Sequence, residues 1–437
     1  MTTERKLFGT DGVRGEAGTF LTAELATSLG RAAVASLDHA KPQVLIVRDT
    51  RESGPMLESA LAAGIAAAGG EALLGGVLPT PAAAVLTKRL SLDLAVVVSA
   101  SHNPYPDNGI KFFSALGTKL DDSTEARMEA LLDDPAEAAE PGRVRELNGG
   151  LGDYLRALEA YFPLDLSGRR VMLDCANGAT FEAAPAIFER LGAEVEAIAV
   201  EPDGRNINDG CGSTHLDRLA EAIAGSEATV GFAFDGDGDR VLAVDGEGRT
   251  HDGDELIALA ARGMAARGEL GGGVAVTVMS NYGFHRAMAE AGIEVATTQV
   301  GDRYVLDELR KRSWALGGEQ SGHIIDTRFA ATGDGIAAAL ATMRELGGDE
   351  LDAVVPMEKL PQKLVNVKVA DREAVSGASA VWEAVESEGA ALEGRGRVLL
   401  RPSGTEPLVR VMAEAPSAEE AEAVCERLAE IVRRELA

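Results

Sequence analysis

Aromatic residues and cysteines are scarce in this chain of 437 residues. Phe, Trp and Tyr together make up 4% of it, so its hydrophobic cores must be built mainly from Ala, Val and Leu. The three cysteines, Cys175, Cys211 and Cys425, lie far apart and form no Cys-x-x-Cys pair. This spacing excludes a disulfide-rich fold and predicts buried, reduced thiols.

Long apolar runs and positive charge are also lacking. No run approaches the roughly 18 residues that a membrane span needs, and the first residues have no apolar signal-peptide core, so we expect a cytoplasmic protein. The 42 basic and 70 acidic residues give a formal net charge of −28, and only nine of the basic residues are lysines. Such a surface disfavours nucleic acid and anionic membranes as partners. Adaptation to high salt is one hypothesis for it, and simple acidic bias is the alternative.

The chain does contain a long alternation of strand-like and helix-like segments. A single core stops growing near about 300 residues, so the length predicts several domains. Apolar strand patterns alternate with helical ones up to about residue 353, which is typical of α/β layers. A Pro-bearing linker over 354–364, the expected hinge, precedes a strand, a helix, a hairpin-like pair and a last helix. We predict three similar α/β units and a smaller α+β unit, with boundaries at 1–150, 151–250, 251–353 and 354–437.

One segment, SASHNPYPDNGIKFF, combines several reactive side chains. It follows the apolar run 92–98, so its polar residues are expected to leave a buried strand and enter a loop. Ser101, His102 and Lys111 fall close together there, around an Asn-Pro turn. This combination suits a serine that carries a phosphoryl group, with an ordinary capped loop as the alternative.

The sequence DGDGDR at 235–240 predicts a metal site at the end of another buried strand. If extended, Asp235 and Asp239 would lie about 13 Å apart, too far for one ion, so the segment must curl around Gly236 and Gly238. Converging carboxylates favour a hard divalent cation, and Mg²⁺ is the expected ion, with a flexible acidic turn as the alternative.

A calcium-binding EF-hand loop does not fit these aspartates. Arg240 stands where that loop needs glycine, and Gly246 stands where it needs glutamate.

Three further loops are rich in polar side chains. RPSGTEPLVR contains Arg401, Ser403, Thr405 and Arg410, a donor set that matches a phosphate dianion. A solvated turn is the alternative interpretation of that loop.

GGEQSGH offers Glu319 and Ser321 for sugar hydroxyls and His323 for proton transfer, whereas a capped loop with a surface histidine is the alternative. FGTDGVRG places Arg14 near the start of the chain, where it can neutralise phosphate. Together the five loops fit phosphoryl transfer to and from a phosphorylated polyol.

These five motifs occur in the order found in the α-D-phosphohexomutases, and the chain resembles that superfamily over its whole length. It is most similar to the phosphoglucosamine mutase branch. Gln320 stands where glucose and mannose enzymes usually carry Met, and GDRY (301–304) stands where they tend to have a Gly-His pair. CGSTH (211–215) and the FGTDGVRG start agree with this branch. A phosphoglucomutase or phosphomannomutase acting on glucose or mannose phosphates is the alternative.

The resemblance implies a role for each motif, with the active site in a central cleft of four domains. Ser101 would carry the phosphoryl group. The ligands of one Mg²⁺ would be Asp235, Asp237, Asp239 and the phosphate on Ser101. The residues around the transferring group would be Arg14, His102, Lys111, Arg240 and His323. The sugar hydroxyls would bind to Glu319 and Ser321. The phosphate that is not transferred would bind to Arg401, Ser403, Gly404, Thr405 and Arg410.

The implied reaction converts glucosamine 6-phosphate to glucosamine 1-phosphate through a 1,6-bisphosphate, which would also serve as activator. The expected partners are small sugar phosphates, and the expected assembly is a monomer or homodimer. Two other classes compete with this interpretation. A haloacid dehalogenase phosphatase also uses strand-end aspartates, but it leaves the serine loop unexplained. A non-catalytic sugar-phosphate sensor would be expected to lack Ser101 or one aspartate, and this chain retains them.

Overall fold

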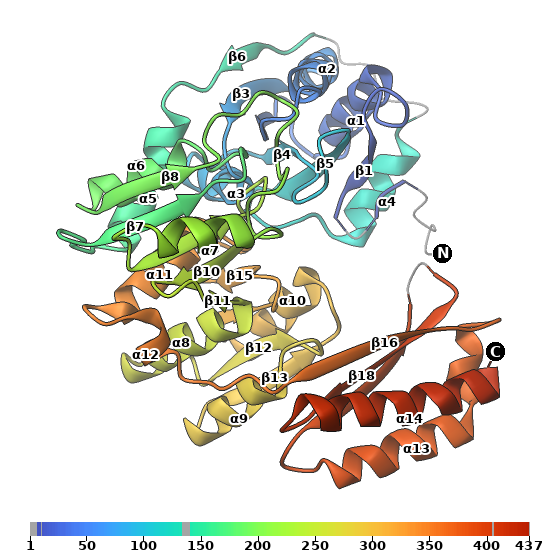
Figure 1. The fold of residues 1–437 in the computed structure, drawn as a ribbon. Coiled ribbons are helices and arrows are strands. Elements are labelled where there is room, and N and C mark those ends of the chain that lie inside the picture. The colour runs from blue at the N-terminus through green and yellow to red at the C-terminus, as the bar shows by residue number, and fades with distance from the viewer. Residues whose placement is uncertain (1–6, 10, 133–139, 404–405, 437) are drawn as a thin grey trace. The chain divides into compact units, whose positions relative to one another are not determined.

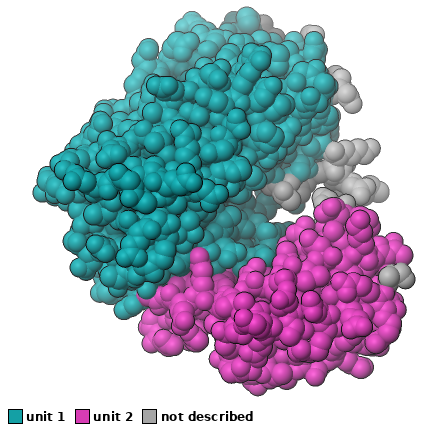
Figure 2. All heavy atoms as spheres, in the orientation of Figure 1, with its two compact units in different colours: residues 1–279, 293–355 teal, residues 280–292, 356–437 magenta. Residues whose placement is uncertain are grey.

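The structure is a computed structural model, and the chain forms two compact units (Figure 2). The described residues are 7–9, 11–132, 140–403 and 406–436. The units are unit 1, Met1–Met279 with Ile293–Val355, and unit 2, Ser280–Gly292 with Pro356–Ala437. Among the described residues, no helix is long and apolar enough to cross a membrane.

The first sheet of unit 1 carries the serine segment (Figure 1). Its strands are β1 (Val13–Glu16), β2 (Gln43–Arg48), β3 (Glu71–Val77), β4 (Leu94–Val98), β5 (Asp107–Ser114) and β6 (Val144–Glu146). The sheet order is β1-β5-β4-β2-β3-β6. β5 is antiparallel to its neighbours β1 and β4, whereas β4, β2, β3 and β6 run parallel to one another. All five residues of β4, the run LAVVV, are buried, as expected for a strand covered on both faces.

Helices cover this sheet and, apart from the one at 80–89, contribute residues to its main core. They are α1 (Ala23–Ala35), α2 (Gly54–Ala67), α3 (Thr80–Arg89) and α4 (Asp122–Ala130). The core is built mostly from Ala, Val, Leu and Ile, as the shortage of aromatic residues predicts. Where α1 and α2 touch, a Cβ on Gly64 would lie 2.1 Å from the carbonyl oxygen of Thr27, so the close approach of the two helices depends on that glycine.

The second sheet of unit 1 carries the aspartate segment. Its strands are β7 (Arg170–Asp174), β8 (Glu194–Ile198), β9 (Val230–Phe234), β10 (Val241–Asp245) and β11 (Thr250–His251). The order is β11-β10-β9-β7-β8, with parallel pairs on one side of β9 and antiparallel pairs on the other. The helices of this region are α5 (Gly150–Tyr161), α6 (Ala183–Arg190) and α7 (Asp217–Ala224).

The third sheet of unit 1 has the order β13-β12-β14-β15, with an antiparallel pair only at β15. Its strands are β12 (Gly273–Thr277), β13 (Glu294–Thr298), β14 (Leu316–Gly318) and β15 (Ile324–Asp326). Its helices are α8 (Gly253–Ala266), α10 (Asp302–Arg312), α11 (Gly335–Leu346) and α12 (Leu351–Val354). The turn from β14 to β15 contains the GEQSGH motif.

Unit 2 is an antiparallel three-stranded sheet, β16-β18-β17, with helices and its own apolar core. Its elements are α9 (Tyr282–Glu290), β16 (Gln362–Lys368), the 3₁₀ helix η1 (Glu373–Gly377), α13 (Ser379–Ala391), β17 (Arg397–Pro402), β18 (Leu408–Glu414) and α14 (Ala418–Leu436).

The predicted fold class is confirmed, with three mixed sheets in α/β layers and a smaller α+β part. The four residue boundaries stay a prediction. One local prediction was wrong: the polar segment after β4 is a loop only as far as Pro106, and β5 follows it. Asp, Asn, Gly and Lys are poor strand formers, so they obscured that strand in the sequence.

Candidate active site

Ser101 lies in the connection between β4 and β5 and is 1% exposed. Its φ of 54° is left-handed, which is uncommon for a residue with a Cβ atom. Its Oγ donates a hydrogen bond of 2.5 Å to Asp235 Oδ2, and His102 Nδ1 lies 3.3 Å from the same Oγ. A single buried hydroxyl is therefore held between a carboxylate and an imidazole, as a nucleophile requires.

The three aspartates of DGDGDR converge in the connection between β9 and β10. One carboxylate oxygen of each of Asp235, Asp237 and Asp239 lies within 4.8 Å of the others, and all three residues are buried. The predicted curl is confirmed, because Gly238 has φ +73° and a Cβ there would lie 2.4 Å from Thr180 Cγ2.

This donor set fits a hard divalent cation. Asp237 Oδ1 and Asp239 Oδ1 are buried and have no hydrogen-bond partner among the described residues. Burial and the two neighbouring carboxylates raise the pKa of Asp235 well above its ordinary value. A cation with oxygen ligands would satisfy both unpartnered atoms and offset this repulsion.

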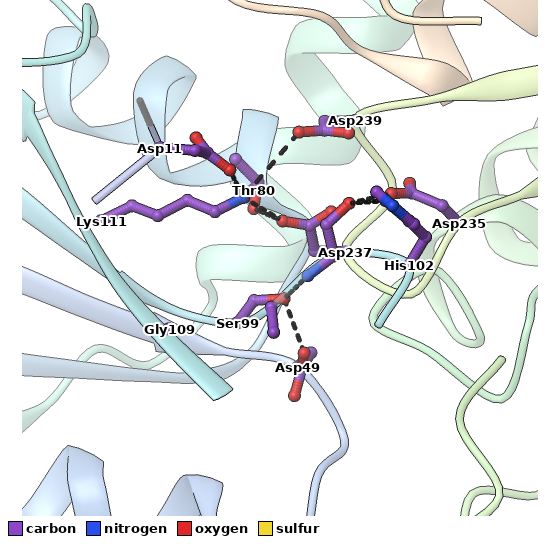
Figure 3. Close-up of polar contacts among 12 residues, drawn as sticks. Asp11, Asp49, Thr80, Ser99, His102, Gly109, Lys111, Asp235, Asp237 and Asp239 are labelled. Atoms are coloured by element: carbon purple, nitrogen blue, oxygen red, sulfur yellow. Dashed lines mark hydrogen bonds and ion pairs between the residues drawn. The ribbon is translucent and has the colours of Figure 1, made fainter. Parts of the chain in front are cut away.

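Lys111 reaches the cluster from β5 and is 2% exposed. Its Nζ lies 2.8 Å from Asp237 Oδ2 and 3.2 Å from Asp11 Oδ2 (Figure 3). Although burial acts in the opposite direction, these carboxylates raise the pKa of Lys111, so the amine stays protonated. Thr80, the first residue of α3, donates to the same Asp237 Oδ2 over 2.7 Å. Two donors thus fix Oδ2 and leave Oδ1 of Asp237 for a cation.

A cavity of about 420 Å³ in unit 1 is lined by loops from all three sheets. The residues predicted from sequence that line it are Arg14, Asp239, Arg240, Glu319 and His323, and the unpredicted charged ones are Asp11, Lys119 and Asp302. Ser321 is exposed on the turn from β14 to β15, and it is not among the described residues that line this cavity. The cavity therefore joins one edge of the aspartate cluster to the predicted sugar loop.

Lys119 links two carboxylates that the sequence analysis missed. Its Nζ lies 2.6 Å from Asp11 Oδ1 and 2.6 Å from Asp302 Oδ2. Burial opposes the effect, but Lys119 holds the pKa of Asp302 below its usual value, so the pair is charged. Asp11 and Asp302 lie in two motifs that the sequence analysis quotes, FGTDGVRG and GDRY. Their place in these motifs is the signal that could have pointed to them. Lys119 lies in no such motif.

Two imidazoles lie near the serine and the aspartates, those of His102 and His323. Burial, with the cations Arg240 and Arg14, lowers the pKa of His102 below its ordinary value, so this ring is neutral near pH 7. His323 is 3% exposed, and its Nε2 accepts a hydrogen bond of 3.3 Å from the Gly333 amide. Both rings can therefore accept or relay protons.

The residues predicted to bind the second phosphate belong to unit 2. Arg401 on β17 and Arg410 on β18 are cross-strand partners. Burial and the charge of Arg410 lower the pKa of Arg401, and Arg410 Nε is buried without a hydrogen-bond partner in the described chain. Ser403 is 2% exposed. Two adjacent guanidinium groups favour an anion. The predicted Gly404 and Thr405 lie outside the described residues.

Comparison with known proteins places the chain in a family. Four family models, phosphoglucomutase/phosphomannomutase α/β/α domains I, II and III and the C-terminal domain, match residues 5–139, 152–248, 252–363 and 364–431. A phosphoglucosamine mutase of Pelotomaculum thermopropionicum is 49% identical over 98% of this chain and 99% of its own length.

Solved structures share the fold. A phosphoglucomutase/phosphomannomutase family protein from Burkholderia thailandensis has a TM-score of 0.84 at 24% identity, covering 98% of this chain and 97% of its own. An Aspergillus fumigatus N-acetylphosphoglucosamine mutase, solved in complex with GlcNAc-6P and magnesium, has a TM-score of 0.67 at 19% identity, covering 99% and 96%. The resemblance identified from the five motifs is thereby confirmed, and the chain belongs to the phosphoglucomutase/phosphomannomutase family.

Proposed function

We propose that this chain is a phosphoglucosamine mutase that interconverts glucosamine 6-phosphate and glucosamine 1-phosphate. The observation that carries the proposal is the buried Ser101 hydroxyl held 2.5 Å from Asp235, within a cluster of three aspartates. Full-length relatives named phosphoglucosamine mutase, at 47–50% identity, support the choice of an amino sugar. Gln320 and the GDRY segment agree with it.

The reaction consists of two phosphoryl transfers through Ser101. In the first, the bond between phosphorus and Ser101 Oγ breaks and phosphorus bonds to the free hydroxyl oxygen of a sugar 6-phosphate. The hydroxyl proton ends on Ser101 Oγ, relayed by the neutral His102 ring, whose Nδ1 lies 3.3 Å from that oxygen. In the second, Ser101 Oγ attacks the other phosphate of the bisphosphate, and the proton returns to the sugar oxygen that is released.

Fixed charges stabilise the transferring group. Arg14 and Arg240 line the cavity beside the aspartates and supply positive charge where the phosphoryl oxygens become more negative. Glu319, in the same cavity, and Ser321, on the same turn, bind the sugar hydroxyls, and His323 lies beside them. Arg401, Ser403, Gly404, Thr405 and Arg410 bind the phosphate that is not transferred.

Magnesium is the cation we infer for the aspartate cluster. The ligands would be Asp235, Asp237, Asp239 and the phosphate on Ser101, and the ion would supply Lewis-acid stabilisation of the transferring phosphoryl group. A sugar 1,6-bisphosphate serves as activator by phosphorylating Ser101. The three cysteines are unpaired in the structure, which agrees with a reducing compartment such as the cytoplasm.

Turnover should favour the amino sugar. With Mg²⁺ and a trace of sugar 1,6-bisphosphate, we expect kcat/KM for glucosamine 6-phosphate to exceed that for glucose or mannose 6-phosphate at least tenfold, about 1.4 kcal/mol. A preference for glucose or mannose phosphate would move the enzyme to the alternative activity and keep its mechanism. No turnover of any of the three would contradict the proposal and return the chain to the sensor class.

Replacing Thr80 should weaken metal binding without unfolding the protein. Thr80→Val removes one of the two donors that hold Asp237 Oδ2, so we expect the dissociation constant of Mg²⁺, measured by calorimetry, to rise about tenfold. Thr87→Val is the matched control, because Thr87 is buried on the same helix and donates only to the backbone oxygen of Ala83. Equal Mg²⁺ affinities in the two variants would refute this role of Thr80.

A further inference from the structure

Arg51 is a fully buried arginine whose guanidinium group lies under the serine loop. It follows β2 and is 0% exposed. Its guanidinium donates five hydrogen bonds, which use all of its N–H groups. Nε donates to Asp49 Oδ2 over 2.8 Å. Three of the other bonds go to backbone oxygens of the connection from β4 to β5, those of Ser101 (2.9 Å), Asn103 (2.8 Å) and Pro104 (2.5 Å). The fourth goes to the backbone oxygen of Asp107 (3.0 Å), the first residue of β5.

The backbone N–H of Ser101 belongs to the same hydrogen-bond network as Arg51. Asp49 Oδ2, the acceptor of Arg51 Nε, also accepts the hydroxyl proton of Ser99 over 2.6 Å. Ser99 Oγ in turn accepts the Ser101 amide over 2.9 Å. The N–H and the C=O of Ser101 are therefore both fixed by one buried network that starts at Arg51 and Asp49.

The loop needs such a support. The left-handed φ of Ser101 is strained for a residue with a Cβ atom, so the conformation persists only where the surroundings impose it. Four carbonyl dipoles point at one place, which is unfavourable unless a cation lies there. A planar guanidinium satisfies them because its donors are spread in a fork, whereas a lysine ammonium has only three donors. Asn208 Nδ2 donates to two of these oxygens, those of Ser101 (2.9 Å) and Asn103 (3.1 Å).

We propose that Arg51 is a positioning residue for phosphoryl transfer, which fixes the backbone around Ser101 so that its Oγ faces Asp235 and the metal-binding cluster. Arg51 acts through the loop, because all of its donors are already used within the protein. The inference rests on the proposed function, since it concerns the geometry of the serine that carries the phosphoryl group.

The test is the variant Arg51→Lys, which keeps the charge beside Asp49 and loses the fork. Because a shift of about 1 Å at a reacting group costs on the order of 100-fold, we expect kcat to fall about 100-fold while KM changes less than threefold. The ³¹P resonance of phosphorylated Ser101 is expected to shift or broaden, since the loop then samples several conformations. Wild-type kcat together with an unchanged ³¹P resonance in Arg51→Lys would overturn the inference.

Two further variants keep the test decisive. Arg205→Lys is the control, because Arg205 is exposed and pairs with Glu52, and its kcat is expected to stay within twofold of wild type. Should Arg51→Lys fail to fold, Asn208→Ala decides: a fall in kcat of about tenfold at constant KM supports the inference, and an unchanged kcat overturns it.

A wild-type protein that turns over no sugar phosphate refutes the proposed function and this inference together. An active wild type with an equally active Arg51→Lys refutes only the positioning role.

Discussion

Ser101→Ala is expected to lower kcat for sugar phosphate turnover by at least about four orders of magnitude, or about 5.4 kcal/mol in activation free energy. In the proposed reaction each of the two transfers passes through Ser101 Oγ, and among the described residues no second hydroxyl has a hydrogen bond to Asp235. Phosphate incorporation from labelled sugar 1,6-bisphosphate is expected to disappear with the activity.

The fold of this variant should persist. Alanine fills the same buried position, and the loss of one hydrogen bond to Asp235 costs about 1 kcal/mol, so circular dichroism and the cooperative melt should stay close to wild type. Ser114→Ala is the matched control, because Ser114 is the last residue of β5 and its hydroxyl bonds only to the nearby Thr118 hydroxyl and Leu116 amide. Turnover of Ser101→Ala within tenfold of wild type, or label still present on the variant protein, would contradict the assignment of Ser101 as the phosphoryl carrier.

Much of this architecture is readable from the sequence, because local patterns and global fold agree. The all-buried run of β4 and the glycine spacing of DGDGDR are local signals, and each correctly predicted a strand end or a curl. The convergence of the three aspartates could be predicted for the same reason, because three carboxylates within five residues come together where Gly238 takes a left-handed φ.

The remaining parts of the site depend on pairs that are distant in sequence. Lys119 meets Asp302 across 183 positions, and no periodicity reports such a contact. Thr80 and Arg51 lie outside every motif with obvious chemistry, yet they hold Asp237 and the serine loop. Lys111 was recognised but assigned to a loop, because its strand begins with Asp107, Asn108 and Gly109, which have low strand propensity. Tertiary packing decides these positions, so a single sequence does not show them.

Asp237→Asn is expected to raise the dissociation constant of Mg²⁺ at least about 100-fold and to lower kcat at saturating metal about 1,000-fold. The reason lies in how the carboxylate is shared. Its Oδ2 accepts from both Thr80 and Lys111, and its Oδ1 is buried without a partner in the described chain. An asparagine has only one oxygen, so it cannot both accept the hydrogen bonds from Thr80 and Lys111 and bind the cation. If that oxygen faces the two donors, an NH₂ group faces the cation. If it faces the cation, the NH₂ group faces Thr80 and the Lys111 ammonium.

Calorimetry with Mg²⁺ and the rise in melting temperature on adding Mg²⁺ both measure this effect without substrate. Wild type should be stabilised by the ion, and Asp237→Asn should show little or no rise, because a ligand stabilises the folded state only in proportion to its binding.

The control for loss of one charge is Asp217→Asn, because Asp217 is an exposed aspartate in the first turn of α7. An Asp237→Asn protein with wild-type Mg²⁺ affinity would show that the three aspartates are not the metal ligands. A loss of Mg²⁺ binding with retained phosphorylation of Ser101 would instead separate the two halves of the site. The serine would then accept the phosphoryl group without the ion, and the aspartates would be needed only to pass it on.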